Sequence, residues 1–205
     1  MLKRTNNALG FTLVELLISL LLGSLLLVML IGLYVNSVSA SAKALQFSRL
    51  RTELQGMLAL MESDIRRAGY GGSEYRVGKD RNKVFDILNT ETQKCIIYAY
   101  NYKLAESISS SYFMGFRYST ATKNLQFGSK VDTQAINCFS SGSWVKLNDP
   151  DFLKITSLSF IESTAVIGQT TKRSVDIAIA GELTTNSDYK YKAKIRVQAR
   201  NSELN

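Results

Sequence analysis

The sequence predicts an α+β fold in which one long N-terminal helix packs against an antiparallel β-sheet. Two observations predict it. From Phe11 to Ala68, apolar residues are either continuous or spaced at the period of a helix. Between residues 95 and 205 there are several short segments rich in Tyr, Phe, Ile and Val, which are typical of strands. The 205 residues and the 45% hydrophobic content suit one domain of ordinary size with an appendage.

The first part of this helix is apolar on every side. No charged residue lies between Leu16 and Ala42, and residues 16–35 alone would make about 30 Å of helix, the thickness of a bilayer's hydrocarbon core. We therefore expect residues 11–36 to span a membrane. The alternative is a cleaved secretory signal ending at the small residues 40–42, but its apolar region would be far longer than such signals have.

The basic residues around this segment predict its orientation. Lys3 and Arg4 precede it, whereas Lys43 is the first charge on its far side. The positive-inside bias puts the N-terminus in the cytoplasm and most of the chain across the membrane.

Beyond the apolar segment the helical period continues as a one-sided stripe. Its members are Phe47, Leu50, Leu54, Met57, Leu58, Met61, Ile65 and Ala68. We expect this half of the helix to pack on a globular head. No proline interrupts Phe11 to Ala68, so one continuous helix of roughly 87 Å is predicted within residues 11–70, with Gly69 as a left-handed cap.

Residues 71–94 are polar and aperiodic, and we interpret them as the connection to the sheet. Residues 95–205 then form the antiparallel head. The predicted strands are 95–101, 112–119, 124–128, 143–147, 155–162, 173–183 and 189–199.

The last of these strands alternates most clearly, with Tyr191, Ala193, Ile195 and Val197 on the inner face. A cationic row faces outward and contains no acid: Lys190, Lys192, Lys194, Arg196 and Arg200. It predicts an electrostatic contact surface. Three explanations stand: protection of an edge strand, docking of an acidic neighbouring subunit, and contact with DNA phosphates. Because no aromatic residue shares this face to stack on bases, we favour the first two over DNA.

Composition excludes several classes of enzyme. The chain has no His and only two Cys, which removes Ser-His-Asp and Cys-His catalysis, His-ligated metals and a four-thiolate zinc site. No nucleophile–base pair, carboxylate cluster or metal-ligand spacing replaces them. We expect no enzymatic activity, no cofactor and no metal. The net charge of +8, from 25 Lys and Arg against 17 Asp and Glu, traces mainly to the N-terminal residues and the cationic row.

The first residues carry the most specific motif. A short basic segment ends at Gly10, and Phe11-Thr12-Leu13-Val14-Glu15-Leu16-Leu17 opens the apolar helix. Glu15 is costly there unless it is paired. If the chain is cut after Gly10, Phe11 gains an α-amino group one turn from Glu15, available to pair with it in the same or a neighbouring chain.

In these residues the sequence resembles type IV pilins and their pseudopilin relatives. The resemblance implies that residues 1–10 are a leader removed by a prepilin peptidase after Gly10, that Phe11 is then N-methylated, and that Glu15 serves methylation or subunit docking during assembly. It also implies the pilin fold, a long N-terminal helix packed on an antiparallel sheet.

Further segments are most similar to PilW-type minor pilins. They are residues 61–72, which close the helix, and residues 95–101, 115–118, 177–183 and 200–201 in the head. The J-type minor pseudopilin of type II secretion is built on a similar plan and remains an alternative. A membrane-anchored periplasmic binding domain is the alternative of another class.

The resemblance implies a minor pilin that helps to prime pilus assembly at or near the tip. Its partners would be the prepilin peptidase, other minor pilins, the major pilin and the inner-membrane assembly platform. Before assembly it would be a single-pass inner-membrane protein with a periplasmic head. Glu15 argues against the outermost position, because a subunit with nothing above it has no neighbouring N-terminus to neutralise.

Cys95 and Cys138 fall on the translocated side, where oxidation is expected. We expect a disulfide that joins the start of the sheet to a distal segment, with two unpaired buried thiols as the alternative. Either role is structural.

Overall fold

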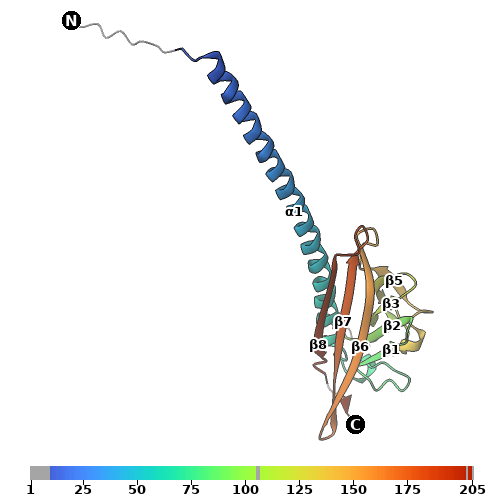
Figure 1. The fold of residues 1–205 in the computed structure, drawn as a ribbon. Helices are drawn as coiled ribbons and strands as arrows, with labels where there is room; N and C mark the ends of the chain where they lie inside the picture. Colours follow the sequence, from blue (N-terminus) through green and yellow to red (C-terminus); the bar gives the residue numbers. More distant parts are fainter. Residues whose placement is uncertain (1–9, 105–106, 202, 205) are drawn as a thin grey trace. The chain divides into compact units, whose positions relative to one another are not determined.

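The computed structural model describes residues 10–104, 107–201 and 203–204 of the chain (Figure 1). The predicted leader, with Lys3 and Arg4, lies almost wholly outside these residues. The chain divides into two units, Met1–Gln46 and Phe47–Asn205, and the second unit is the head. One helix, α1 (Leu13–Arg67), crosses the division. It is close to the helix predicted for 11–70.

α1 ends at Arg67, just before the glycine that the sequence predicts as its cap. Gly69 has φ +77°, a left-handed conformation that favours glycine. Its N–H donates to the carbonyl of Ala99 at 2.7 Å, and a Cβ at Gly69 would lie 2.9 Å from Val84 Cγ1. This position therefore needs glycine both for its backbone angle and for the close approach of the sheet.

The first sheet of the head has five antiparallel strands in the order β1-β2-β3-β4-β5. The strands are β1 (Phe85–Asn89), β2 (Gln93–Ala99), β3 (Phe113–Ser119), β4 (Asn124–Ser129) and β5 (Ser143–Lys146). Short 3₁₀ helices occur at Ser73–Tyr75, Ser110–Tyr112 and Ala135–Asn137.

The second sheet is a four-stranded antiparallel sheet, and Figure 1 shows its three long strands side by side. The strands are β6 (Leu153–Ile167), β7 (Thr170–Leu183), β8 (Lys190–Gln198) and the short β9 (Glu203–Leu204). β8 pairs with β7 from Glu182 to Ser174, and β9 pairs with β7 at Thr170 and Thr171. β8 is thus an edge strand.

Two expectations need correction. The predicted α+β class, a long helix packed on antiparallel strands, is confirmed, but the strands form two sheets and not one, and these sheets share no strand pairing among the described residues. The region 71–94, predicted as a connection, contains a 3₁₀ helix and strand β1, so the first sheet begins before residue 95. β1 is short, and it is a strand because it pairs with β2 along its whole length. The residues of β1 alone do not indicate this pairing.

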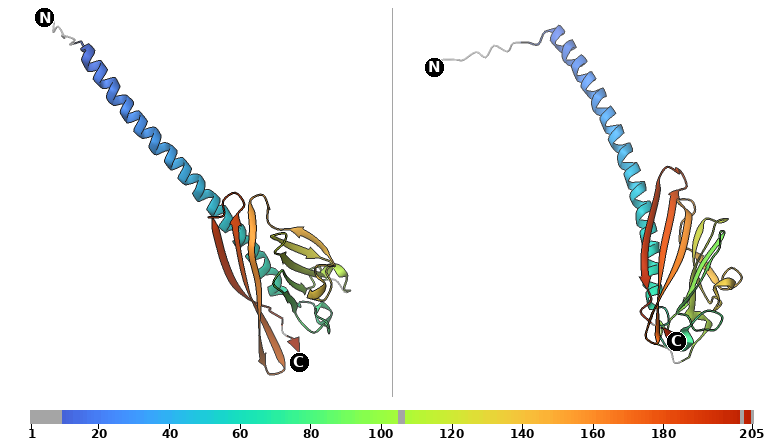
Figure 2. Two further views of the ribbon diagram at one scale, coloured as in Figure 1. Left: turned by 45° about the vertical axis from the view of Figure 1, so that its right-hand side comes forward. Right: turned by 60° about the horizontal axis from the view of Figure 1, so that its bottom comes forward.

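One core joins α1 to both sheets, and Figure 2 shows the end of α1 running along β8. Every member of the predicted stripe is buried except Phe47, which is 37% exposed and lies 6.4 Å from the rings of Tyr189 and Tyr191. On β7, a Cβ at Gly181 would lie 3.3 Å from Leu54 Cδ1 and 2.8 Å from Leu153 Cδ1. Glycine at this position lets the helix come close to the sheet.

β2 is buried on both faces, because the outer side of the first sheet carries a second core. Ile96 and Tyr98 face the main core, while Cys95 and Ile97 face the second cluster, as the period of two in a strand requires. Cys95 and Cys138 form the expected disulfide there, with a sequence separation of 43. In the chain-entropy model a disulfide that closes a loop of this size stabilises the folded state by roughly 4 kcal/mol.

Candidate functional site

The residues of the leader motif lie at the exposed start of α1. Gly10 and Phe11 precede the helix, and Phe11 is 81% exposed. The N–H of Glu15 donates to Thr12 Oγ1 at 3.3 Å, so Thr12 caps the helix. Glu15 sits in the first turn, where a negative charge interacts favourably with the helix dipole. The Thr12–Glu15 spacing also matches that of a capping box, a local role that the sequence analysis did not consider.

The carboxylate of Glu15 has no cationic partner among the described residues. It is followed by apolar side chains that no other described part of the chain covers. From Leu13 to Val38, every large apolar side chain of α1 is at least 49% exposed. Within the described part of the chain, α1 is the one helix long and apolar enough to cross a membrane.

Four members of the cationic row, Lys190 to Arg196, lie on β8, where they are exposed and alternate with half-buried residues, and Arg200 lies just after the strand. The predicted alternation along the strand is therefore confirmed, and β8 is an edge strand of the second sheet. Alternating lysines at such an edge discourage the addition of a further strand.

The row is partly neutralised by a neighbouring strand. Asp176 on β7 lies directly opposite Arg196. Arg196 donates to it from Nε at 2.8 Å and from Nη2 at 3.1 Å, and Lys194 Nζ lies 3.4 Å away. The bonds from Arg196 are the main cause that lowers the pKa of Asp176. Lys194 and Arg196 are thus paired with an acid from the next strand, whereas Lys190, Lys192 and Arg200 have no carboxylate partner among the described residues.

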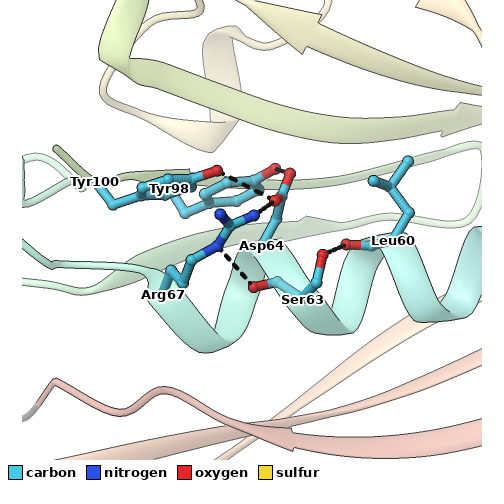
Figure 3. Close-up of polar contacts among 6 residues, drawn as sticks. All are labelled: Leu60, Ser63, Asp64, Arg67, Tyr98 and Tyr100. Atoms are coloured by element: carbon cyan, nitrogen blue, oxygen red, sulfur yellow. Dashed lines mark hydrogen bonds and ion pairs between the residues drawn. The ribbon is translucent and has the colours of Figure 1, made fainter. Parts of the chain in front are cut away.

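The structure adds one residue that the sequence analysis did not single out, Asp64 near the end of α1 (Figure 3). Its side chain faces the first sheet and is buried, with 5% of the residue exposed. Tyr98 donates its hydroxyl to Oδ2 at 2.8 Å, Tyr100 donates to Oδ1 at 3.2 Å, and Arg67 forms an ion pair with Oδ1. Both carboxylate oxygens are thus satisfied.

The surroundings of Asp64 keep its partners protonated. Burial, together with the negative charge of Asp64, raises the pKa of Tyr98 well above its usual value. The same two causes raise the pKa of Tyr100 to about 12. Both hydroxyls therefore remain donors throughout the physiological range. Arg67 also lies over Tyr100, with Cζ 4.6 Å from the ring centroid.

A sequence signal for Asp64 exists. It lies three residues after Met61 and four before Ala68, so it falls on the apolar stripe itself. A carboxylate on such a stripe requires a buried partner. Which partner it has depends on the sheet, which the helix sequence does not contain.

Comparison with protein families identifies two regions. Residues 5–31 match the prokaryotic N-terminal methylation motif. Residues 43–199, more than half of the chain, match the family described as prepilin peptidase-dependent protein B.

The chain belongs to the prepilin peptidase-dependent protein B family. The resemblance to type IV pilins is confirmed: this is a pilin-like protein with an N-terminal methylation motif and a helix-plus-sheet head. Comparisons with curated proteins and with solved structures give no match.

The two matched regions divide the sites between them. Gly10, Phe11 and Glu15 lie in the methylation motif, whereas Asp64, the disulfide and the cationic row up to Arg196 lie in the region matched by the family. No group of three His, Cys, Asp or Glu side chains that would suit a metal ion occurs among the described residues.

Asp64→Ala is expected to destabilise the head by about 3 kcal/mol, because it leaves two buried tyrosine hydroxyls without an acceptor. Tyr98→Phe removes one of the bonds and is expected to cost about 1 kcal/mol. The measurement is urea unfolding of the detergent-solubilised chain, followed by the fluorescence of Trp144, its single tryptophan.

Glu62→Ala is the matched control. Glu62 pairs with Arg66 on the same helix but is partly exposed, so its loss is expected to cost no more than about 0.5 kcal/mol. Equal losses for the Asp64 and Glu62 variants would show that the buried network contributes nothing specific.

Proposed function

We propose that this protein is a minor pilin of a type IV pilus that helps to prime pilus assembly and lies at or near the tip. The match of residues 5–31 to the N-terminal methylation motif carries this proposal. The motif leads directly into the apolar first part of α1. The second part of the same helix packs against the head. Family membership supports the same assignment, because the family is described as dependent on prepilin peptidase.

Processing would change the charge at the start of α1. Cleavage after Gly10 gives Phe11 an α-amino group, and N-methylation leaves that amine cationic. A cation at a helix N-terminus opposes the helix dipole and is costly in lipid, so a carboxylate partner is needed. Glu15, one turn along and without a partner among the described residues, would supply it in the same chain or in a neighbouring subunit.

The uncovered helix would be used in two environments in turn. As a precursor, the protein is held in the inner membrane, with Lys3 and Arg4 on the cytoplasmic side and the head in the periplasm. The disulfide fits an oxidising compartment of this kind. During assembly the apolar residues from Leu13 to Val38 would exchange lipid for the helices of other minor pilins and the major pilin, at the inner-membrane assembly platform.

Two alternatives remain, and they differ in what they require. A J-type minor pseudopilin of type II secretion would use the same processing and a similar fold. A membrane-anchored periplasmic binding domain would keep its N-terminal residues and never leave the membrane.

The mature N-terminus is the first test. Mass spectrometry of the protein from its native membrane is expected to find a chain that begins with N-methylated Phe11. An uncut chain would indicate a permanent anchor, and a start near Lys43 would indicate a secreted domain.

Gly10→Val is expected to abolish cleavage. A Cβ at Gly10 meets nothing within 4 Å, so the variant tests recognition by the peptidase and not folding. Gly23→Ala also meets nothing within 4 Å, and this control is expected to be cut normally.

Glu15→Ala is expected to be cut after Gly10 but to fail in piliation, because the new α-amine loses its counterion. The readout is the amount of the protein in sheared fibres, relative to its amount in the membrane. Thr12→Ala is the control: it removes the cap bond to the Glu15 N–H but leaves the carboxylate. Normal incorporation of Glu15→Ala would contradict the pairing mechanism.

Deletion of the gene separates pilus from secretion. Loss of surface fibres and of twitching, with normal secretion, is expected for a minor pilin. Exoproteins trapped in the periplasm of a strain with normal fibres would assign the protein to type II secretion instead.

A further inference from the structure

A cationic hollow lies where α1 and the second sheet end together. A cavity of about 740 Å³ is lined by residues from three places: the last turn of α1, the outward faces of β7 and β8, and the segment after β8. The lining residues are Arg66, Lys172, Ser174, Arg196, Gln198, Ala199 and Arg200. A second cavity of about 410 Å³ shares Arg66 and Arg200 and extends along α1 to Ala59.

The fold explains why these residues meet. The register pairs Ser174 of β7 with Gln198 of β8, which places Lys172 and Arg200 just beyond the paired segment. The N–H of Arg200 donates to the carbonyl of Arg66 at 3.0 Å and ties the segment after β8 to the last turn of α1. Four cations from distant parts of the chain are thereby gathered around one hollow.

Within the described part of the chain, two of these four cations have a carboxylate partner. Arg196 pairs with Asp176, and Arg66 pairs with Glu62 one turn earlier on α1. Lys172 and Arg200 have no carboxylate partner among the described residues, and no carboxylate lines the larger cavity. The hollow therefore offers one ammonium and one guanidinium group to an outside anion.

We infer that this hollow, named here the Arg200 hollow, binds an acidic peptide segment that presents carboxylates to Lys172 and Arg200. The inference deepens the proposed function, on which it rests, because it gives the chain a surface for an acidic neighbouring protein. Arginine binds carboxylates with two parallel hydrogen bonds, and complementary charge sets the register between partners. The contact surface is thus smaller than the row predicted from β8 alone, and it includes residues outside that strand.

The same observations disfavour a nucleic acid at this site. A phosphate backbone that follows β8 would meet Asp176 in the middle of its path. No aromatic residue lines the cavity, so bases would have no ring on which to stack. Two unpaired cations suit a compact group of carboxylates better than a long polyanion.

The test measures binding of a fluorescent hexaglutamate peptide to the full processed chain in detergent. Double charge reversal with Lys172→Glu and Arg200→Glu is expected to weaken binding by on the order of tenfold to a hundredfold. Lys190→Glu with Lys192→Glu is the matched control, because it makes the same charge change on β8 outside the hollow. The control is expected to change binding less than about threefold, and Lys172→Arg is expected to retain it.

Four outcomes would overturn the inference. They are no measurable binding by the unaltered chain, equal losses in both double variants, displacement of the peptide by duplex DNA at lower concentration than by unlabelled peptide, and equally effective displacement by inorganic phosphate. Failure of this test leaves the mass of the mature N-terminus unaffected, so it is distinguishable from failure of the proposed function.

Discussion

The packing of α1 against two sheets at once is the interaction on which the head depends. The sheets share no hydrogen-bonded ladder among the described residues. Single hydrogen bonds join them, such as the one from the Tyr118 hydroxyl on β3 to the Ile155 carbonyl on β6, and both sheets contribute to one apolar core with α1. Leu54 reaches the second sheet where Gly181 leaves room for it, and Asp64 reaches the first sheet at Tyr98. The helix therefore covers apolar side chains on the inner faces of both sheets.

The buried carboxylate of Asp64 adds direction to this packing. Apolar contacts alone are non-directional and would tolerate small rotations of a helix on a sheet. The bonds from Tyr98 and Tyr100 are satisfied only when Asp64 faces β2. Because a buried charge is weak evidence for stability in itself, we interpret this network as one that fixes the orientation of α1. The arrangement of the Arg200 hollow follows from it, since Arg66 and Arg67 occupy the same turn.

Function follows from the contrast between the two parts of α1. After residue 46 one side of the helix is buried by its own chain, whereas from Leu13 to Leu45 every large apolar side chain of the helix is exposed. Such a segment is soluble only in lipid or among other apolar helices, which is what a pilin-like protein requires before and during assembly. The net charge of +8 arises in large part from the cationic row, and Asp176 on the neighbouring strand pairs with two of its members, which weakens the argument for a nucleic-acid-binding protein.

The sequence by itself determined the features that depend on neighbouring residues. The leader motif, the apolar segment and the stripe from Leu50 to Ala68 are local patterns, and so is the alternation along β8. The disulfide between the two cysteines was expected because both fall on the translocated side of the membrane, where oxidation is expected. Pairing between distant segments was decided only by the tertiary structure. β1 becomes a strand through its register with β2, the strands divide into two sheets, Asp64 finds Tyr98 across the core, and Asp176 neutralises Arg196 from the next strand. The Arg200 hollow likewise joins residues more than a hundred positions apart, from α1, β7 and the end of β8, and helical or strand periodicity carries no information about such contacts.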